Sequence, residues 1–205
     1  KEKYKEILIQ FIPEQSIDLI AEWIVMFNFD LRITKNRSSK LGDFRNATSN
    51  ERHKISVNHN LNPFAFLITL VHEIAHLTCW EKHKWRVKPH GEEWKIEFRK
   101  LMHFFFFEGI FPEDIQNALE RYMQDPAASS CSDVTLQRVL KKYDTIHRSN
   151  NYVLLEQIPA DSKFIYNGKR IFVKGEKVRK RFRCVEVKSN RAYLFSPLAE
   201  VEVVE

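Results

Sequence analysis

Two histidines and one glutamate stand at a spacing that suits metal-assisted hydrolysis, in the segment His72-Glu73-Ile74-Ala75-His76. Residues four apart on a helix lie on the same face, one turn from each other, so His72 and His76 are able to bind one metal ion together. Zinc suits neutral imidazole nitrogen, and a catalytic zinc site keeps three protein ligands and one position for water. Glu73 is then placed to take a proton from that water and later to protonate a leaving amine. The pattern predicts one zinc ion per chain and peptide-bond hydrolysis, with Glu73 as general base and then general acid.

The sequence around this segment indicates that it is buried. Between Ile55 and Trp80, Glu73 is the one formally charged residue. An isolated buried carboxylate beside two imidazoles is costly unless something such as a metal ion compensates it. The other residues on the histidines' side of the helix are apolar or small: Ile68, Thr69, Ala75 and Cys79. This context favours a metal site over a chance occurrence of the pattern.

A third ligand must come from the chain that follows, and spacing alone leaves several candidates. The pattern HExxHxxGxxH would place a histidine at position 82, where this chain has Lys82, so that subclass is excluded. His90 stands out because it begins a helix, where a side chain is held stiffly. We interpret His83 as an exposed loop residue because of its charged neighbours. The candidates within reach of a returning chain are His83, His90, Glu92, Glu93 and Glu97.

Hydrophobic periodicity predicts a mainly helical first part that positions these residues. The central helix, over 63–80, has Asn62 as its cap and an apolar stripe that includes Leu67, Leu70 and Ile74. Short β-prone runs before it predict a small sheet. The predicted helices are 2–11, 13–28, 63–80, one that begins near 90, and about 112–123; the predicted strands are 30–33, 42–45 and 54–58.

Residues 126–205 differ in composition from this helical part. Asp125-Pro126 and the small residues 127–130 predict a linker, and Ser132 is the expected cap of a last helix that ends at Tyr143. Beyond residue 150, apolar runs separated by turn residues predict a small antiparallel sheet with strands 153–155, 164–166, 171–173, 178–187, 192–195 and 201–204. The predicted fold class is α+β: a helical domain over 1–125, then a linker, a helix and a basic β-rich domain that begins near 126 or 145.

The run Val71-His72-Glu73-Ile74-Ala75-His76, followed by His90-Gly91-Glu92-Glu93-Trp94, resembles the SprT-like family, which includes the Spartan proteases. Segments 32–38 and 41–45 are similar to the sheet that precedes the family's active helix. The resemblance covers about residues 15–125 and implies a zincin-like metallopeptidase domain. It also implies that His90, in its HGxxW segment, is the third zinc ligand. A further implication is action near DNA, which for Spartan-type members means cleavage of proteins crosslinked to DNA.

Cysteine usage departs from the pattern of bacterial members, which commonly carry a four-cysteine zinc ribbon after the catalytic part. Of the three cysteines, Cys79, Cys131 and Cys184, two lie in that region, too few for a closed structural site. We therefore expect no second zinc. The wide cysteine spacing also favours a reducing, cytoplasmic setting. The N-terminal segment lacks the apolar core of a signal peptide, and we expect no stretch long enough to span a bilayer.

Two basic stretches are candidates for contact with DNA, in a sequence-independent manner. Residues 163–191 hold eleven Lys or Arg against two Glu, and residues 32–54 hold seven against Asp43 and Glu51. Basic side chains along a strand would neutralise phosphates, and an exposed Phe would stack on an unpaired base. The alternative is a solvated strand face that guards a sheet edge. The candidate contacts are Arg32, Lys35, Arg37, Lys169, Arg170, Lys174, Lys177, Arg179 and Arg181.

These observations predict a zinc endopeptidase that acts on protein substrates near DNA. With 205 residues and 43% hydrophobic residues, the chain has the composition of a globular protein rather than a disordered one. Two alternatives stay open: a nucleic-acid-binding protein with a structural zinc and no turnover, and a zinc hydrolase of small amides with a deep closed pocket. Glu73 argues against the first, because structural zinc sites close all four positions with ligands and need no adjacent base.

Overall fold

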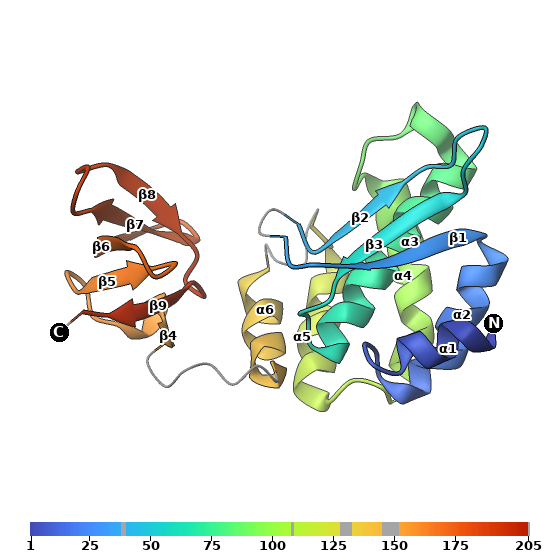
Figure 1. Ribbon diagram of the computed structural model, residues 1–205, viewed down its shortest axis with the longest axis horizontal. Coiled ribbons are helices and arrows are strands. Elements are labelled where there is room, and N and C mark those ends of the chain that lie inside the picture. The colour runs from blue at the N-terminus through green and yellow to red at the C-terminus, as the bar shows by residue number, and fades with distance from the viewer. Residues whose placement is uncertain (38–39, 108, 128–132, 145–151, 205) are drawn as a thin grey trace. The chain divides into compact units, whose positions relative to one another are not determined.

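The computed structural model divides into two compact units, Lys1–Thr145 and Ile146–Glu205. It describes residues 1–37, 40–107 (Phe107 by its backbone alone), 109–127, 133–144 and 152–204. The first unit is mainly helical with a three-stranded sheet, and the second contains a six-stranded antiparallel sheet (Figure 1). The predicted α+β class is therefore confirmed. The division falls after residue 145, the later of the two boundaries that the sequence suggested.

The elements of the first unit follow the hydrophobic periodicity of the sequence. Its helices are α1 (Glu2–Leu8), α2 (Ile17–Met26), α3 (Pro63–His83), α4 (Glu92–Phe107), α5 (Glu113–Gln124) and α6 (Val134–Leu140). Its strands are β1 (Phe29–Thr34), β2 (Gly42–Arg45) and β3 (His53–Asn58), in the order β1-β3-β2. β1 runs parallel to β3 and β2 antiparallel to it. Each of these elements overlaps the range that the sequence predicted for it.

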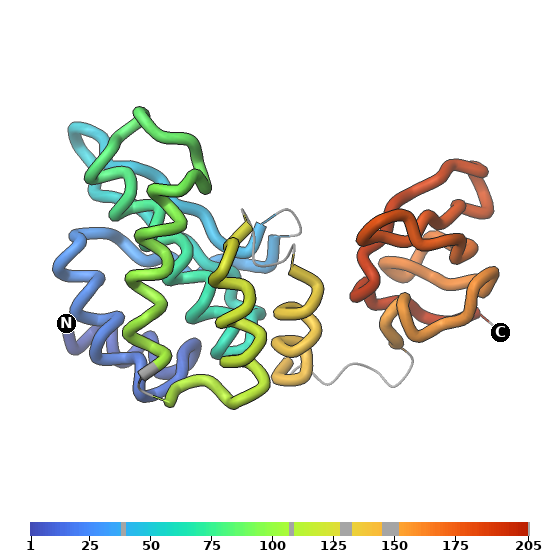
Figure 2. The backbone as a smooth tube through the Cα atoms, turned by 180° about the vertical axis from the view of Figure 1, so that it is seen from behind, coloured from blue at the N-terminus to red at the C-terminus, as the bar shows by residue number. Residues whose placement is uncertain are grey.

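Helix α3 forms the centre of the first unit. It packs against β2 and β3 on one side and against α4 on the other (Figures 1 and 2). Pro63 occupies its first turn, where a missing backbone N–H costs nothing, and Asn62 accepts a hydrogen bond from the Ala65 N–H at 2.9 Å. The Asn62 amide also donates to the Leu140 carbonyl and to Asp144. One buried residue therefore caps α3 and ties it to the end of α6.

The hydropathy of α3 corrects one expectation from the sequence. Residues Pro63–Arg86 form a 24-residue helical stretch that contains an 18-residue window with a mean hydropathy of 1.2, so it is long and apolar enough to cross a bilayer by length and composition alone. However, 78% of its most apolar window is buried within the protein. We therefore interpret it as the core helix of this unit.

The second unit is a sheet of short strands around its own core. The strands are β4 (Tyr152–Leu154), β5 (Lys163–Tyr166), β6 (Arg170–Val178), β7 (Arg181–Glu186), β8 (Ala192–Phe195) and β9 (Glu200–Val203), in the order β4-β9-β5-β6-β7-β8. Strands β5 to β8 form a meander, and β9 returns to pair between β4 and β5. Phe164, Phe172 and Phe195 meet in its core, with ring centroids 4.9–5.6 Å apart. Its main cluster of buried side chains includes Leu155, Ile158, Cys184 and Val201 in addition.

Two local predictions need correction. The single strand expected over 178–187 is the turn and second strand of a β6–β7 hairpin, in which Val178 pairs with Arg181. The cap of α6 is Asp133, whose carboxylate accepts from the Leu136 N–H at 2.8 Å. Ser132, the expected cap, and residues 128–130 of the predicted linker lie outside the described residues.

Candidate metal centre

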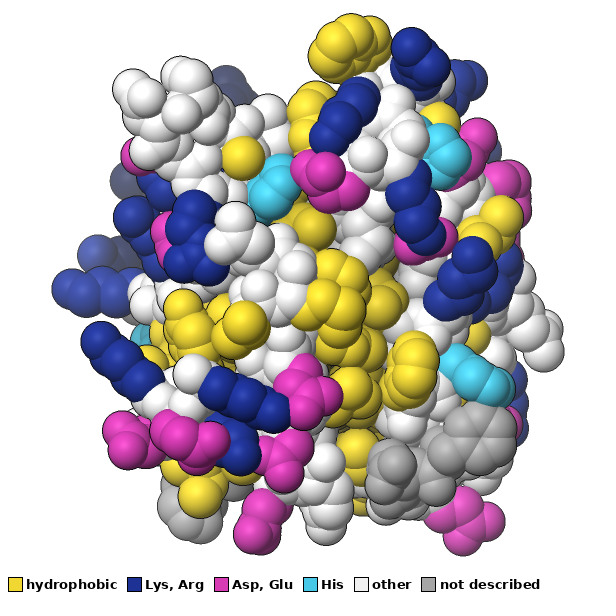
Figure 3. Space-filling model, turned by 90° about the vertical axis from the view of Figure 1, so that its right-hand side faces the viewer, with side chains coloured by type: hydrophobic (Ala, Val, Ile, Leu, Met, Phe, Trp, Pro, Cys, Tyr) yellow, Lys and Arg dark blue, Asp and Glu magenta, His cyan; other side chains and the backbone are white. Residues whose placement is uncertain are grey.

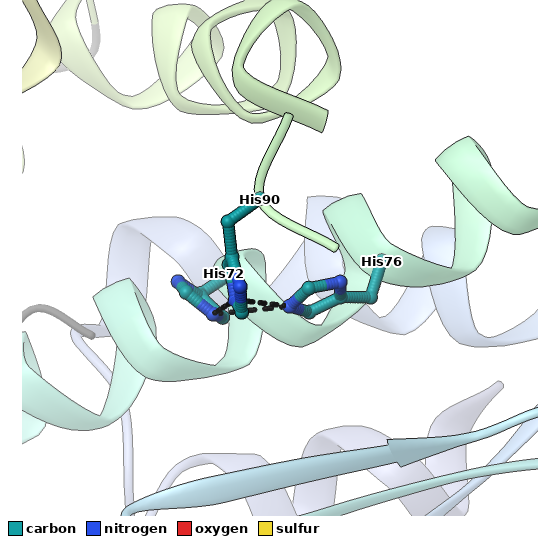
Figure 4. A group of neighbouring side chains, drawn as sticks. All are labelled: His72, His76 and His90. Atoms are coloured by element: carbon teal, nitrogen blue, oxygen red, sulfur yellow. Dashed lines mark hydrogen bonds between the residues drawn. The ribbon is translucent and has the colours of Figure 1, made fainter. Parts of the chain in front are cut away.

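Three histidines from two parts of the first unit converge on one point (Figure 4). His72 and His76 project from adjacent turns of α3, and His90 comes from the turn before α4. The Nε2 atoms lie 3.2 Å apart for His72 and His76, 2.8 Å for His76 and His90, and 3.3 Å for His72 and His90. The sequence prediction that these three side chains meet agrees with this geometry.

Two sides of the nitrogen triangle, 3.2 and 3.3 Å long, match the spacing that a shared metal ion requires, and the third, at 2.8 Å, is shorter. Three nitrogens placed tetrahedrally at about 2.0–2.1 Å from one ion lie about 3.3–3.4 Å from each other. Without an ion, hydrogen bonds join only some of these nitrogen atoms, and the lone pairs of the others face each other. The three histidines therefore fit a metal ion as a donor set, although the geometry alone does not name the metal.

Burial keeps the imidazoles in the neutral form that binds metals. It places the pKa of His72 well below its ordinary value and lowers that of His76 to about 3, with the neighbouring imidazole of His90 adding to the effect. Burial also lowers the pKa of His90. Uncharged imidazoles offer lone pairs to a cation, so this environment favours metal binding over protonation.

The turn before α4 directs His90 back toward α3. His90 has a φ of 58°, in the left-handed region that histidine adopts more readily than most residues. The next residue, Gly91, donates its N–H to the Lys88 carbonyl at 2.9 Å. A Cβ at Gly91 would lie 3.0 Å from that same carbonyl oxygen, so the turn is tight enough to favour glycine. Both residues of the His90-Gly91 pair are thus needed to shape the turn.

Trp94 forms an aromatic floor beneath the three imidazoles. Its ring centroid lies 4.6 Å from that of His72, 5.3 Å from His76 and 4.8 Å from His90. Phe98 stacks behind it at 5.0 Å. Trp94 is 1% exposed, so its packing restricts the rotamers of all three histidines. This explains physically why an aromatic residue follows His90 by one helical turn.

Glu73 lies against the edge strand β2 rather than in solvent. A Cβ at Gly42 would lie 2.4 Å from the Glu73 Oε1, so glycine leaves the room that this carboxylate occupies. Burial, and secondarily the charge of Asp43, raise the pKa of Glu73 to about 8. Arg37, Lys40 and a hydrogen bond from the Phe44 backbone act in the opposite direction. Glu73 is 7% exposed and only partly compensated, which is common for a group that transfers protons.

The other candidates for a third ligand are engaged elsewhere or lie apart from the cluster. Glu97 pairs with Lys82 at 2.6 Å, and Glu92 pairs with Lys95 at 2.9 Å. Among the described residues, the one group of His, Cys, Asp or Glu placed to hold a metal is the three-histidine cluster. His83 and Glu93 do not belong to it.

The N-terminal basic candidates lie on and after β1. Arg32 and Lys35 are exposed. Arg37 donates from Nε to Asn58 at 2.8 Å and from Nη1 to Ser56 at 3.0 Å, so it is partly held within the fold. The face that carries α1 and α2 shows basic and acidic side chains interspersed rather than one basic patch (Figure 3).

The basic candidates of the second unit separate into two classes. Lys169, Lys177, Arg179 and Arg181 are exposed, as a contact with polyanions requires. Lys174 is 5% exposed; its Nζ donates to the Ile158 carbonyl at 2.5 Å and lies 4.3 Å from the Phe182 ring centroid. Arg170 pairs with Glu186 at 2.6 Å and lies over the Tyr193 ring. The burial of Lys174 contradicts its expected role as a phosphate contact, and Arg170 already pairs with a carboxylate.

Sequence reasoning missed a cavity that borders the histidines. Its volume is about 400 Å³, and it lies between the end of edge strand β2, the C-terminal half of α3 and the loop before α4. The signal in the sequence that could have indicated this cavity is Trp85, an aromatic residue within a charged loop that has no hydrophobic periodicity. The residues that line the cavity are Phe44, Asn46, His76, Cys79, Trp80, Lys84, Trp85, Val87, Lys88, Pro89, His90 and Trp94.

Comparison with families of known proteins matches residues 22–117 to the SprT-like family. The match contains β1 to α4 and all three histidines, together with Glu73. This segment of the chain belongs to the SprT-like family. The family is metallopeptidase-like in general character, in agreement with a histidine cluster able to bind a metal ion. Searches of curated proteins and of solved structures give no match.

Proposed function

We propose that this SprT-like protein is a zinc-dependent metallopeptidase. The observation that carries the proposal is the convergence of three neutral Nε2 atoms within 2.8–3.3 Å of each other, two of them from helix α3, which also holds a buried Glu73. His72, His76 and His90 would hold the zinc ion. Three histidines without a fourth protein ligand are typical of catalytic rather than structural zinc sites.

The chemistry that zinc supplies in such a site is to lower the pKa of a water molecule and to polarise a carbonyl group. Glu73 accepts the proton of the attacking water as general base and then donates it to the leaving amine as general acid. The Phe44 backbone N–H holds the Glu73 carboxylate in place, and Gly42 leaves the room that this carboxylate occupies. Trp94 fixes the imidazoles and excludes water from the side of the core.

The proposed substrates are proteins associated with DNA, in the manner that the family resemblance implies. The exposed cations Lys169, Lys177, Arg179 and Arg181 of the second unit support a sequence-independent contact with phosphates. Arg32 and Lys35 are further exposed candidates on the first unit. We propose a cytoplasmic location for this activity and a role in the repair of DNA–protein crosslinks.

The deciding experiment measures zinc content together with cleavage of a DNA-bound protein, with and without DNA. We expect one zinc per chain in both the native sequence and Glu73→Gln. Cleavage should be stimulated by DNA and should fall by about 10²- to 10⁴-fold in the variant, the usual contribution of a general base. Glu97→Gln is the matched control, since Glu97 is 6% exposed but outside the histidine cluster, and it should retain both zinc and cleavage.

Each other outcome has a defined meaning. One zinc per chain without cleavage under any condition would favour a nucleic-acid-binding protein whose metal has no catalytic role. A metal-free chain after exposure to zinc would contradict the proposal at its base. Equal cleavage with and without DNA would leave the peptidase in place and remove DNA as its activator.

A further inference from the structure

The cavity beside the histidines has the size and chemistry of a side-chain pocket. Its volume of about 400 Å³ lies at the lower end of the range for sites that enclose small ligands. Apolar and aromatic side chains supply most of its wall: Phe44, Cys79, Trp80, Trp85, Val87, Pro89 and Trp94. Because the described lining contains no carboxylate, a cationic side chain would find no partner inside it.

Its position couples the cavity to the metal centre. His76 and His90 belong both to the cavity wall and to the metal-binding triangle. Phe44, which also lines the cavity, offers its backbone N–H to Glu73. A side chain that fills the cavity therefore belongs to a residue within about one peptide unit of the reacting carbonyl.

The outer lip of the cavity is unusual for a monomer surface. Trp85 lines the cavity and yet is 80% exposed, and the exposed Lys84 and Lys88 line it as well. A ligand that covers a tryptophan exposed to this extent removes apolar surface from water, which favours binding. Lys84 already pairs with Glu81 at 3.1 Å, so Lys88 is the cation that favours a ligand with negative charge near the cavity mouth.

We infer that this cavity selects the peptide substrate: it binds a large apolar side chain next to the scissile bond, in a segment with acidic neighbours. Trp80 and the Cys79 side of α3 form its inner wall, and Trp85 closes over the bound side chain. The inference rests on the proposed peptidase function. It adds the substrate class, and it makes Cys79 and Trp85 specificity-determining residues.

A binding measurement tests this without turnover. Two glycine–serine host peptides that differ at one position, Phe or Ala, are titrated into zinc-loaded Glu73→Gln and followed by tryptophan fluorescence. We expect the Phe peptide to bind roughly 10- to 100-fold more tightly, the range that burial of one large apolar side chain gives. The native sequence should then cut the Phe peptide at a bond next to Phe, as read by mass spectrometry.

Two variants locate the effect in the cavity. Trp85→Ala removes the lip and should reduce the Phe-to-Ala preference by about tenfold, with little change in stability because Trp85 is exposed. Cys79→Leu occupies part of the cavity and should weaken the Phe peptide while leaving the Ala peptide unchanged. Phe104→Ala is the matched control, because Phe104 is an aromatic residue that is 54% exposed and does not line the cavity.

The outcomes separate this inference from the proposed function. Equal affinity for the Phe and Ala peptides would overturn the inference even if the native sequence cleaves protein. Tight, Trp85-dependent binding of the Phe peptide without any cleavage would support the pocket and count against the peptidase. If Trp85→Ala weakened a thymidine oligonucleotide but neither peptide, the lip would be a nucleic-acid contact and the inference would fail.

Discussion

Both units bury an ionisable side chain, and the surroundings of the two side chains differ. In the first unit, Glu73 is 7% exposed and only partly compensated, and its pKa is raised to about 8. In the second, Lys174 is 5% exposed, donates to the Ile158 carbonyl and lies over the Phe182 ring. A buried ionisable group with hydrogen-bond partners, such as Lys174, serves the fold. A buried group that its neighbours compensate only partly, next to metal-binding histidines, is available for chemistry. The surroundings, rather than the residue type, distinguish a reactive group from a structural one.

The largest effect should come from the aromatic floor. Trp94→Ala removes a ring that is 1% exposed and contacts all three histidines. We expect a loss of about 3–5 kcal/mol in the free energy of unfolding of the first unit, and weaker zinc binding. Phe172→Ala, also fully buried, should destabilise the second unit by a similar amount and leave zinc binding unchanged. Denaturant titrations with zinc analysis check this, and loss of zinc in both variants would show that the units are not independent.

A smaller, purely catalytic effect should follow from crowding Glu73. In Gly42→Ala, the new methyl group would lie 2.4 Å from the present position of the Glu73 Oε1, so the carboxylate must move. A displacement of about 1 Å in a catalytic group costs on the order of 100-fold in rate. We expect kcat to fall by that amount while zinc content stays at one per chain. Cleavage at the native rate would mean that the carboxylate position in the structure is not the working one.

The smallest effect separates the two kinds of lysine in the second unit. Lys177→Met removes an exposed cation and should weaken DNA binding a few-fold, lowering the slope of log affinity against log salt by about 1. Lys174→Met should leave DNA binding unchanged. It should instead cost about 1–3 kcal/mol of unfolding free energy, because the Ile158 carbonyl loses its donor. A DNA defect in Lys174→Met with normal stability would reverse this assignment.

Local sequence signals were sufficient for much of the first unit. The capping residue Asn62 and the helix after it were predictable, because capping and amphipathic periodicity are local. The β2 bounds, Gly42–Arg45, also agree with the prediction. Sequence spacing alone left five candidates for the third ligand, and the resemblance selected His90. The cavity was not predictable, because the loop conformation depends on left-handed backbone at Lys84 and His90 that no periodic pattern encodes.

The error at Lys174 has a simple physical cause. Side chains two apart on a strand share a face, so Arg170, Phe172 and Lys174 point to the same side of β6. Phe172 is in the core, and Lys174 follows it inward, whereas Arg170, at the strand end, keeps 45% of its side chain exposed. A run of alternating basic and apolar residues is therefore not enough to place the basic side chains on an exposed face. The core residues of the strand must also be known, because a basic residue two positions from one of them points inward as well.

The long apolar helix α3 poses a choice of environment as well as a choice of fold. Its most apolar 18-residue window has a mean hydropathy of 1.2, which is a lipid-compatible composition. Glu73 lies midway along the helix, next to His72 and less than one turn before His76. A charged residue near the centre of a membrane span raises the free energy of insertion by about 3 kcal/mol. The residues that give this helix its chemistry thus also raise the free energy of inserting it into a membrane while the chain is being synthesised.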